Sequence, residues 1–437
     1  MSDNTREHVL IGNNYFVEIV PSDTQTKSLL VEKVAEIEKQ GHDRSLLLAD
    51  LGHIIQKHKR WEQNLPRVKP YYAVKCNSAY PVLKILSYLG VNFECASQAE
   101  IMSILDLGIR PSRIAFSNTI KPTSSIRYAA QNGVELMAFD NEEELHKIQS
   151  VYPKAKLLLR IKPEGSMKVK VDLSKICGCF SCESRDLLLT AKMFQLDVVG
   201  VSFNVGSGCE DSSVFDETIR VARDVFNTGF ELGFKMTLLD IGGGFPGTDT
   251  SKVNFEEMSS VIMKALDTHF PEREINIVAE SGRYFVASAF TLATHIMGKR
   301  TVKRYPGNKV SDGNIVDPTD NQMVEDRMYY INDGVFQSFM YYLLFHAETE
   351  LTPFTLKDTE SGTLFKSTLW GSTCANVDCI MEDVLLPDLH SGDWMYFPNM
   401  GAYTSTMSTS FNGMLNPMVC FFCRKDVWGS LNSNAAN

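Results

Sequence analysis

Residues 134–161 read VELMAFDNEEELHKIQSVYPKAKLLLRI. Two short apolar runs, VELMAFD and AKLLLRI, enclose a polar stretch long enough for three turns of helix. Asn141 and Glu144 have the spacing of an N-terminal helix cap, in which a short polar side chain accepts a backbone N–H three residues on. The segment therefore predicts a strand, a helix and a second strand parallel to the first.

The same unit recurs from about residue 46 to residue 290. Ser97 with Glu100 repeats the cap signal, and Gly108 and Gly133 follow helical stretches as C-terminal glycines do. Eight such units close into a (β/α)8 barrel, and the alternative is an open doubly wound sheet. We expect the barrel, on the count of the strand-like runs at 68–76, 91–97, 113–118, 134–140, 155–161, 196–204, 236–243 and 275–281.

The flanking parts have a different pattern. Residues 291–437 carry short β-rich runs separated by turn residues and predict a C-terminal all-β domain. Residues 1–45 contain NNYFVEIV, which is expected to add a strand to that domain. Residues 303–326 are rich in polar residues, Gly and Pro and predict a long loop.

Composition narrows the class of protein. The chain has 437 residues, 44% of them apolar, with a net charge of −10. An excess of acidic residues disfavours binding to nucleic acid, and no apolar run reaches the length of a membrane span. The start shows no secretory signal and the ten cysteines suggest reduced thiols, so we expect a cytoplasmic protein. Cys177, Cys179 and Cys182 have no second cluster to complete a zinc site, and no metal is expected.

Residues suited to chemistry collect where the expected strands end, which is where barrel enzymes place their active sites. Lys75 ends the first strand among apolar neighbours that would lower its pKa, as a Schiff-base lysine requires. The alternative is a lysine that reaches into solvent. Glu280 ends the eighth strand, either as a catalytic carboxylate or as the ion-pair partner of Arg160 or Arg283.

Glycine-rich turns follow three neighbouring strands. Gly206 and Gly208 flank Ser207, Gly242–Gly244 follow the next strand, and Gly282 precedes Arg283. Backbone N–H groups in such turns, with a hydroxyl and a guanidinium beside them, form a phosphate cradle. A lysine, a carboxylate and a phosphate cradle together indicate pyridoxal phosphate.

The motifs YAVKCN, VGVSFNVGSGC, LLDIGGGFPG, AESGRYFVASAFTLA, WGSTC and GDWMYFPNMGAYT resemble those of eukaryotic ornithine decarboxylases and their antizyme-inhibitor relatives. The resemblance extends from about residue 10 to residue 430. It implies a pyridoxal phosphate barrel with a β domain of the alanine racemase-like fold. It also implies a homodimer with two shared active sites.

The resemblance assigns roles to individual residues. Lys75 matches the imine lysine, Glu94 stands where the family has an aspartate near the cofactor, and Cys374 matches the thiol that returns a proton to the substrate carbon. Phe411 matches a residue near the subunit interface. The other matched cofactor residues are Arg160 under the ring, Glu280 at the ring nitrogen, and Ser207, Gly242, Gly243, Gly244, Gly282, Arg283 and Tyr403 at the phosphate.

Departures from the family bear on the substrate. Ala375 and Phe345, which follows Leu344, replace the two aspartates that hold the distal ammonium of ornithine. A buried ammonium without a counter-charge is costly, whereas each buried methylene of an aliphatic tail contributes ~0.8 kcal/mol. Asp378 and Glu348 lie nearby in sequence as possible replacement anions. Leu344, Phe345, Ala375 and Phe411 are therefore the expected substrate pocket.

Asn204 replaces the histidine that stacks on the cofactor ring, at a loss of ~0.5–1.5 kcal/mol of aromatic contact. The residues for the cofactor and for protonation otherwise match the family, while the pocket for the distal charge is apolar. We therefore expect a decarboxylase for a neutral aliphatic amino acid, with leucine the first choice. The alternative is an inactive antizyme-binding inhibitor, which Asn204, Ala375 and Ile176 favour and which would use residues 117–145, with Lys121 and FDNEEEL (139–145). A third alternative, that ornithine is still the substrate, needs a replacement anion.

Overall fold

The computed structural model describes residues 6–12, 14–164, 169–250, 253–304, 324–347, 350–357 and 362–434. Contacts divide the chain into two compact units. The first comprises residues 17–50 and 290–426 with the first nine residues, and the second comprises residues 51–289 with residues 10–16 and the end of the chain.

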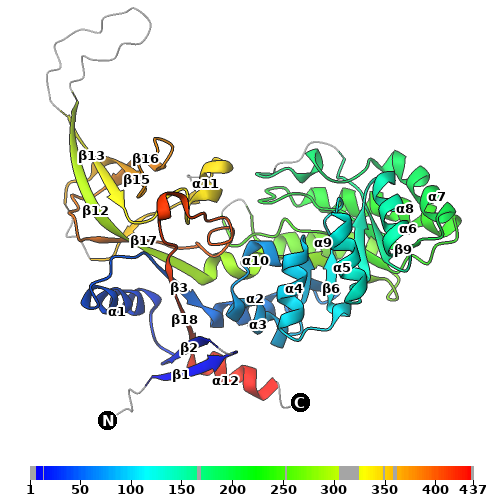
Figure 1. Cartoon of the computed structure of the whole chain (residues 1–437), viewed down its shortest axis with the longest axis horizontal. Helices are drawn as coiled ribbons and strands as arrows, with labels where there is room; N and C mark the ends of the chain where they lie inside the picture. The colour runs from blue at the N-terminus through cyan, green and yellow to red at the C-terminus, as the bar shows by residue number, and fades with distance from the viewer. Residues whose placement is uncertain are drawn as a thin grey trace, which may run out of the picture. The chain divides into compact units, whose positions relative to one another are not determined.

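The second unit is a closed barrel of eight parallel strands within the described residues, so the barrel is confirmed over the open sheet. Each expected run contributes one strand, in chain order around the barrel, and β11 closes it against β4. Figure 1 shows strands β6 and β9 of the barrel among the surrounding helices. The strands are β4 (Val68–Ala73), β5 (Asn92–Cys95), β6 (Ile114–Phe116), β7 (Leu136–Phe139), β8 (Lys156–Arg160), β9 (Asp197–Ser202), β10 (Leu238–Asp240) and β11 (Asn276–Glu280).

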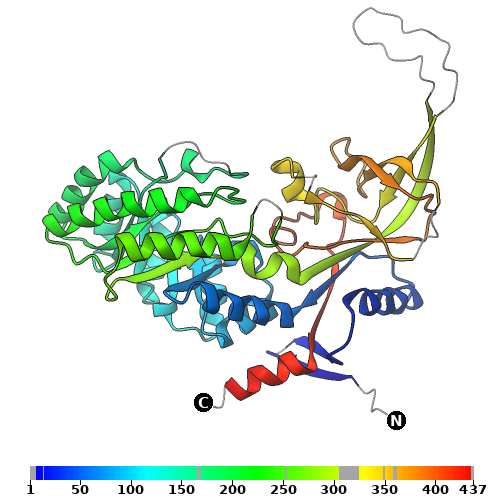
Figure 2. The same cartoon turned by 180° about the vertical axis from the view of Figure 1, so that it is seen from behind.

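Helices connect the strands and cover the barrel, and α8 and α9 lie side by side on its outside (Figure 2). The expected caps are present: Ser97 accepts the N–H of Glu100, and Asn141 accepts the N–H of Glu144. Gly108 and Gly133 have positive φ angles of 78° and 72°, as C-terminal glycines require. The helices are α2 (Leu51–Asn64), α3 (Tyr80–Tyr88), α4 (Gln98–Asp106), α5 (Thr123–Gln131), α6 (Glu142–Val151), α7 (Ser184–Met193), α8 (Ser213–Glu231), α9 (Phe255–His269) and α10 (Arg283–Val286).

The first unit is built on a mixed sheet of ten described strands in the order β1-β2-β18-β3-β12-β13-β15-β16, with β17 on β12 and β14 on β17. Its second strand comes from the NNYFVEIV segment, as expected. The strands are β1 (Glu7–Ile11), β2 (Tyr15–Val20), β3 (Leu46–Asp50), β12 (Phe290–Arg304), β13 (Val324–Ile331), β14 (Phe354–Thr355), β15 (Phe365–Trp370), β16 (Cys379–Leu386), β17 (Trp394–Phe397) and β18 (Met418–Arg424).

Two features of this unit differ from expectation. It contains helices, α1 (Thr26–Lys39) and α11 (Met340–Leu344), and α12 (Lys425–Asn434) follows the last strand. The expected loop at 303–326 is shorter at both ends, because β12 continues to Arg304 and β13 begins at Val324. The remainder of that loop lies outside the described residues.

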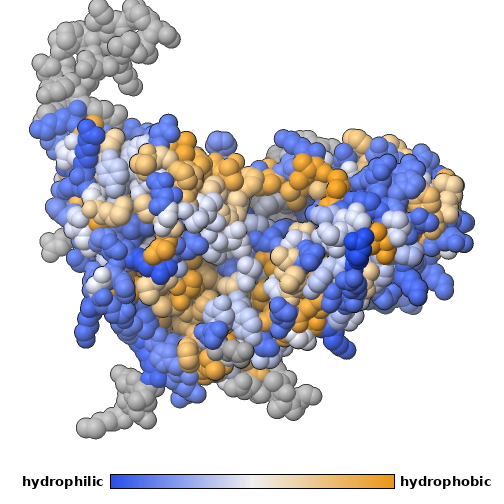
Figure 3. Space-filling model, in the orientation of Figure 1, coloured by the Kyte–Doolittle hydropathy of each residue, from blue (hydrophilic) through white to orange (hydrophobic). Residues whose placement is uncertain are grey.

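The surface view shows polar and apolar side chains interspersed, with apolar side chains gathered over α11 (Figure 3). Among the described residues, no helix combines the length and the apolar character that crossing a membrane requires. The same residues contain no group of three or more side chains suited to holding a metal ion.

Candidate active site

Charged side chains form one layer inside the mouth of the barrel. Along β10, Leu238 packs inward against Tyr71 and Val278, so Asp240, two residues on, also points inward. Glu280 follows Val278 by the same step on β11. Four buried charged residues lie at or near the C-terminal ends of β5, β8, β10 and β11. They are Glu94, Arg160, Asp240 and Glu280, each at most 6% exposed.

Lys75 lies in a short 3-10 turn, Val74–Cys76, directly after β4. Its Nζ is 2.8 Å from Oε2 of Glu94 on β5, and its side chain is 43% exposed. Burial raises the pKa of Glu94 to about 7 although the charge of Lys75 opposes the shift, and the charge of Glu280 adds to it. The pair therefore places a basic amine beside a carboxylate that can exchange a proton near neutral pH.

Glu280 has both an arginine and an amide as neighbours. Nη1 of Arg160 lies 3.8 Å from its Oε2, and Nδ2 of Asn204 donates to the same oxygen at 3.3 Å. Burial favours the protonated form, but the charges of Arg160 and Lys75 outweigh it and hold the pKa of Glu280 below its usual value. The side chains of Ser117 and Asn204 also lower the pKa of Glu280. Oε1 of Glu280 is buried and has no hydrogen-bond partner among the described residues.

The side-chain amide of Asn204 makes two hydrogen bonds in the site. Its Oδ1 accepts the N–H of Gly206 at 2.9 Å while its Nδ2 donates to Glu280. The amide thus shapes the turn after β9 and orients the carboxylate.

The glycine turn after β10 leaves no room for side chains. A Cβ on Gly242, whose φ is +65°, would lie 2.1 Å from the carbonyl oxygen of Phe203, and a Cβ on Gly243 would lie 3.2 Å from that of Glu280. A Cβ on Gly282 would lie 2.7 Å from that of Cys76. Only glycine allows these turns to approach one another so closely.

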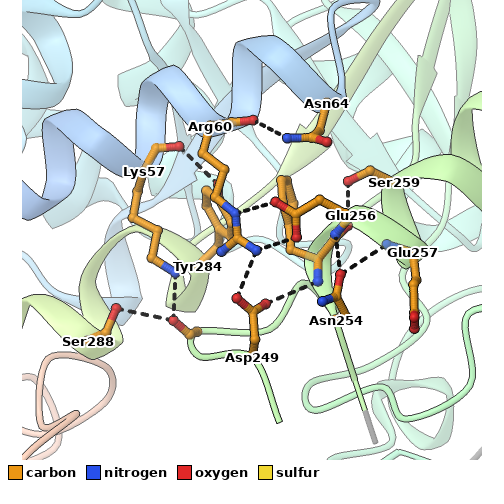
Figure 4. Close-up of polar contacts among 12 residues, drawn as sticks. Lys57, Arg60, Asn64, Asp249, Asn254, Glu256, Glu257, Ser259, Tyr284 and Ser288 are labelled. Atoms are coloured by element: carbon orange, nitrogen blue, oxygen red, sulfur yellow. Dashed lines mark hydrogen bonds and ion pairs between the residues drawn. The ribbon is translucent and has the colours of Figure 1, made fainter. Parts of the chain in front are cut away.

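The far end of this turn is anchored by α2 and the segment after α10. Nζ of Lys57 donates to the carbonyl of Gly247 at 3.0 Å, and Oγ of Ser288 donates to the same oxygen at 3.2 Å (Figure 4). Next to it, Arg60 bridges Asp249 and Glu256. Burial, helped by the charge of Arg60, lowers the pKa of Lys57 to about 8.

Two further residues expected to contact the phosphate, Ser207 and Arg283, lie after the ends of β9 and β11. Ser207 follows β9, where its N–H donates to the carbonyl of Val171 at 3.0 Å. Arg283 is the first residue of α10. The barrel therefore brings together Lys75, Glu94, Arg160, Asn204, Ser207, Gly242–Gly244, Glu280, Gly282 and Arg283 from the ends of neighbouring strands.

The other expected residues belong to the first unit. Cys374 is exposed, and Nδ2 of Asn412 lies 3.5 Å from its sulfur. Phe411 stacks on Phe336 with ring centroids 4.3 Å apart. The ring of Tyr403, at a φ of 57°, stacks on Tyr341 at 5.9 Å.

Leu344 ends α11 and Phe345 follows it directly. The two residues are 55% and 37% exposed, so this unit has apolar groups on its surface. Asp378, near Ala375, cannot act as a replacement anion. It is 1% exposed, and its carboxylate accepts the N–H groups of Val335 and Thr373 and the Thr373 hydroxyl. Glu348 lies outside the described residues.

Lys121 was expected to lie on an antizyme-binding surface, and the structure shows that it does not. Its side chain is buried, with Nζ 2.8 Å from Glu144 and bonded to the carbonyls of Asn118 and Ala138. Glu144 is also buried, and Lys147 pairs with its other oxygen at 2.5 Å. Of the FDNEEEL stretch, Glu142 and Glu143 are exposed.

Sequence reasoning missed Asp240. The signal was available, because Asp240 stands two residues after Leu238 in a strand and so shares its inward face. Its Oδ1 accepts the N–H of Gly242 at 2.9 Å, which ties it to the glycine turn.

A barrel with a lysine, a carboxylate with spare acceptor capacity and tight glycine turns at its strand ends has the parts of a pyridoxal phosphate protein. A family model described as "Pyridoxal-dependent decarboxylase, pyridoxal binding domain" matches residues 51–287. The chain belongs to this family of pyridoxal phosphate-dependent decarboxylases.

Individual relatives agree with this assignment. Antizyme inhibitor 2 of Xenopus laevis is 45% identical over 401 residues, covering 91% of this chain and 86% of the relative. Ornithine decarboxylase of Rattus norvegicus is 44% identical over 405 residues, covering 92% and 86%. The crystal structure of the Paramecium bursaria Chlorella virus arginine decarboxylase superimposes with a TM-score of 0.81 at 33% identity, covering 91% of this chain and all of that one.

Proposed function

We propose that this protein decarboxylates a neutral aliphatic L-amino acid, with leucine the favoured substrate, to carbon dioxide and the primary amine. The observation that carries the proposal is the apolar character of residues 344, 345 and 375, combined with the engagement of Asp378 in backbone hydrogen bonds. An ammonium at the end of a substrate side chain would find no carboxylate there among the described residues.

The cofactor fits the barrel mouth. Lys75 would hold it covalently, and Glu280 would accept the N–H of its ring through the oxygen that lacks a donor. Arg160 and Asn204 would pack at the ring. The phosphate would be held by Ser207, Gly242, Gly243, Gly244, Gly282, Arg283 and Tyr403.

Bound pyridoxal phosphate supplies an electron sink for the substrate bond that breaks. The protein's own groups handle the protons. Glu280, kept anionic by Arg160 and Lys75, would accept a hydrogen bond from the ring nitrogen and so favour its protonated form. Glu94, with a pKa of about 7, receives the proton that Lys75 must lose before its amine can react. The exposed thiol of Cys374 returns a proton to the substrate carbon after carbon dioxide has left.

Leu344, Phe345, Ala375 and Phe411 are proposed to line the pocket for the substrate side chain. Each methylene buried there contributes ~0.8 kcal/mol, whereas an unpaired ammonium costs several kcal/mol. Leu344, Phe345 and Phe411 are exposed within their own unit, and Ala375 is half-buried. We propose that each active site of a homodimer takes these side chains from the partner subunit.

The test is carbon dioxide release by the purified protein with added pyridoxal phosphate, comparing leucine with ornithine. Lys75→Ala should abolish release from leucine, and Cys374→Ala should lower kcat by about 10²-fold or more, the usual size of a lost acid–base group. Cys182→Ala is the matched control, since it removes another exposed thiol and should leave the rate unchanged. Release from ornithine alone would refute the apolar pocket.

A second candidate function is binding of antizyme without catalysis, which the relative named antizyme inhibitor 2 supports. The burial of Lys121 and Glu144 removes two charges from the surface expected to serve it. Its test is co-purification with antizyme, using Glu142→Lys with Glu143→Lys to disrupt the exposed acidic pair. Binding together with no carbon dioxide release from either amino acid would favour the inhibitor.

A further inference from the structure

Among the described residues, the barrel mouth buries the carboxyl groups of Glu94, Asp240 and Glu280, and the cations within ion-pair distance of them are Lys75 and Arg160. Lys75 pairs with Glu94 at 2.8 Å and Arg160 pairs with Glu280 at 3.8 Å. Among the described residues, no cation lies within ion-pair distance of Asp240, which is 3% exposed. A buried carboxylate without a counter-charge is costly, so the third carboxyl group keeps its proton.

The position of Asp240 fits the same proton. Its Oδ1 accepts the N–H of Gly242 at 2.9 Å. Asp240 pairs with Val278 in the register of β10 and β11, so its side chain is on the same inward face as that of Glu280, two residues further along β11. Two carboxyl groups can share a hydrogen bond only when one of them donates. Glu280 is the one held ionised, by Arg160, so Asp240 is the one that can donate.

The charges around Asp240 also favour its protonated form. Burial and then the charge of Glu280 raise the pKa of Asp240 well above its usual value, while the N–H of Gly242 and the charge of Arg160 oppose the shift. Tyr71 on β4 also faces Asp240, and burial raises the pKa of that phenol, so it adds no charge.

We infer that Asp240 is a positioning residue for the cofactor: as a neutral acid it donates to Glu280 and fixes that carboxylate toward the ring nitrogen, while its other oxygen holds the first glycine of the phosphate turn. This inference rests on the proposed cofactor role of Glu280. It links the two ends of the cofactor, ring nitrogen and phosphate, through one side chain that touches neither.

Two substitutions of Asp240 test whether the side chain acts as a neutral hydrogen-bond donor or as an anion. Asp240→Asn keeps an acceptor for Gly242 and offers a permanent N–H to Glu280, whereas Asp240→Ala removes both. The matched control is Asp140→Asn, which changes another strand-end aspartate whose carboxylate accepts a backbone N–H, that of Gly178 at 2.8 Å. Each apoprotein is titrated with pyridoxal phosphate and with its 1-deaza analogue, which lacks the ring nitrogen, and Kd is read from the absorption band of the bound cofactor.

Asp240→Ala is expected to weaken pyridoxal phosphate at least tenfold, as loss of a hydrogen bond to a charged group does, and to weaken the deaza analogue at least fivefold less. Asp240→Asn and Asp140→Asn should bind pyridoxal phosphate within about threefold of the wild type. Equal losses of both ligands in Asp240→Ala would overturn the link to Glu280.

A tenfold loss in Asp240→Asn would show that the aspartate acts as an anion, which also overturns the inference, and this arm remains decisive if the alanine variant does not fold. If the wild type binds no pyridoxal phosphate, the proposed function itself fails. Leucine turnover plays no part in these readouts, so an error about the substrate leaves the inference standing.

Discussion

At the scale of single residues, the pair of Lys75 and Glu94 makes the stability of the cofactor-free protein depend on pH. Glu94 has a pKa of about 7 in the fold, against about 4.5 in an unfolded chain. Between these values the folded state binds more protons than the unfolded state, so stability falls as pH rises through that window. Relative to Glu94→Gln, the apoprotein should lose roughly 1–3 kcal/mol of unfolding free energy between pH 4.5 and 7.5.

Denaturant unfolding at a series of pH values measures this difference. Glu143→Gln, which changes an exposed glutamate on α6, should show no comparable pH-dependent difference from the wild type. A constant offset between wild type and Glu94→Gln across the window would show that Glu94 is ionised throughout.

The proposed preference for leucine over ornithine also depends on single residues. Restoring both anions, with Ala375→Asp and Phe345→Asp together, should lower kcat/KM for leucine and raise it for ornithine, each by at least tenfold. The physical reason is that a carboxylate pair offsets the cost of burying the ammonium and spoils the apolar lining. Competition between the two amino acids in one carbon dioxide assay measures the ratio, with Ala375→Ser with Phe345→Leu as the uncharged control. An unchanged ratio would exclude these positions from the pocket.

The location of a side chain could be predicted from the sequence where its place along a strand determines which way it points. Arg160 and Glu280 could be placed together because both end inward-facing strands of one barrel. Lys121 could not be recognised as buried, since its burial depends on Glu144, which is far along the chain and lies in a stretch that looks fully solvated. The inward position of Asp240 follows from its alternation with Leu238, but its hydrogen bond to the glycine turn depends on the folded backbone.

At the scale of elements, the glycine turn after β10 admits a direct test. Gly242→Ala should weaken pyridoxal phosphate at least tenfold, because the added Cβ meets the backbone of Phe203 at 2.1 Å and the φ of +65° disfavours alanine. Gly108→Ala is the matched control: its φ is +78°, but nothing lies within 4 Å of the added Cβ. It should cost about 1 kcal/mol of stability and leave cofactor affinity unchanged. Fluorescence titration of the apoprotein checks both, and full affinity in Gly242→Ala would show that the turn does not serve the cofactor.

Elements with strong local signals could be predicted from the sequence, and elements that depend on distant partners could not. The barrel strands are short, apolar and separated by capped helices. Helix α1 lacks such a signal, because Gln25 at its start makes no side-chain cap, and its buried face of Leu29, Leu30, Val34 and Ile37 packs against the mixed sheet. The end of β12 and the start of β13 are polar, and their sequence therefore predicted a loop. These residues form strands because each segment pairs with the other.

At the scale of the whole molecule, the mixed sheet depends on a strand from near the end of the chain. β18 pairs in parallel with both β2 and β3. Phe422 in β18 is 1% exposed and packs in the same core as Val20 and Leu48. Phe422→Ala should therefore cost about 3–5 kcal/mol of unfolding free energy.

Hydrogen exchange would locate the effect, with faster exchange expected in β2 and β3 than in the barrel strands. Phe16→Ala, on the neighbouring strand but 60% exposed, should leave the exchange of both regions unchanged. Uniform loss of protection over both units would mean that they unfold together.

The place of β18 in the chain also sets an order of events during synthesis. The barrel strands follow one another without interruption, so the barrel can close as soon as β11 has left the ribosome. β2 and β3 emerge before the barrel does, yet the strand that belongs between them is translated only after all of the barrel strands. Until then the nascent chain carries two open strand edges, which are ready sites for association with other chains. Slow translation or a premature stop near residue 418 would therefore leave a finished barrel attached to a sheet that cannot close.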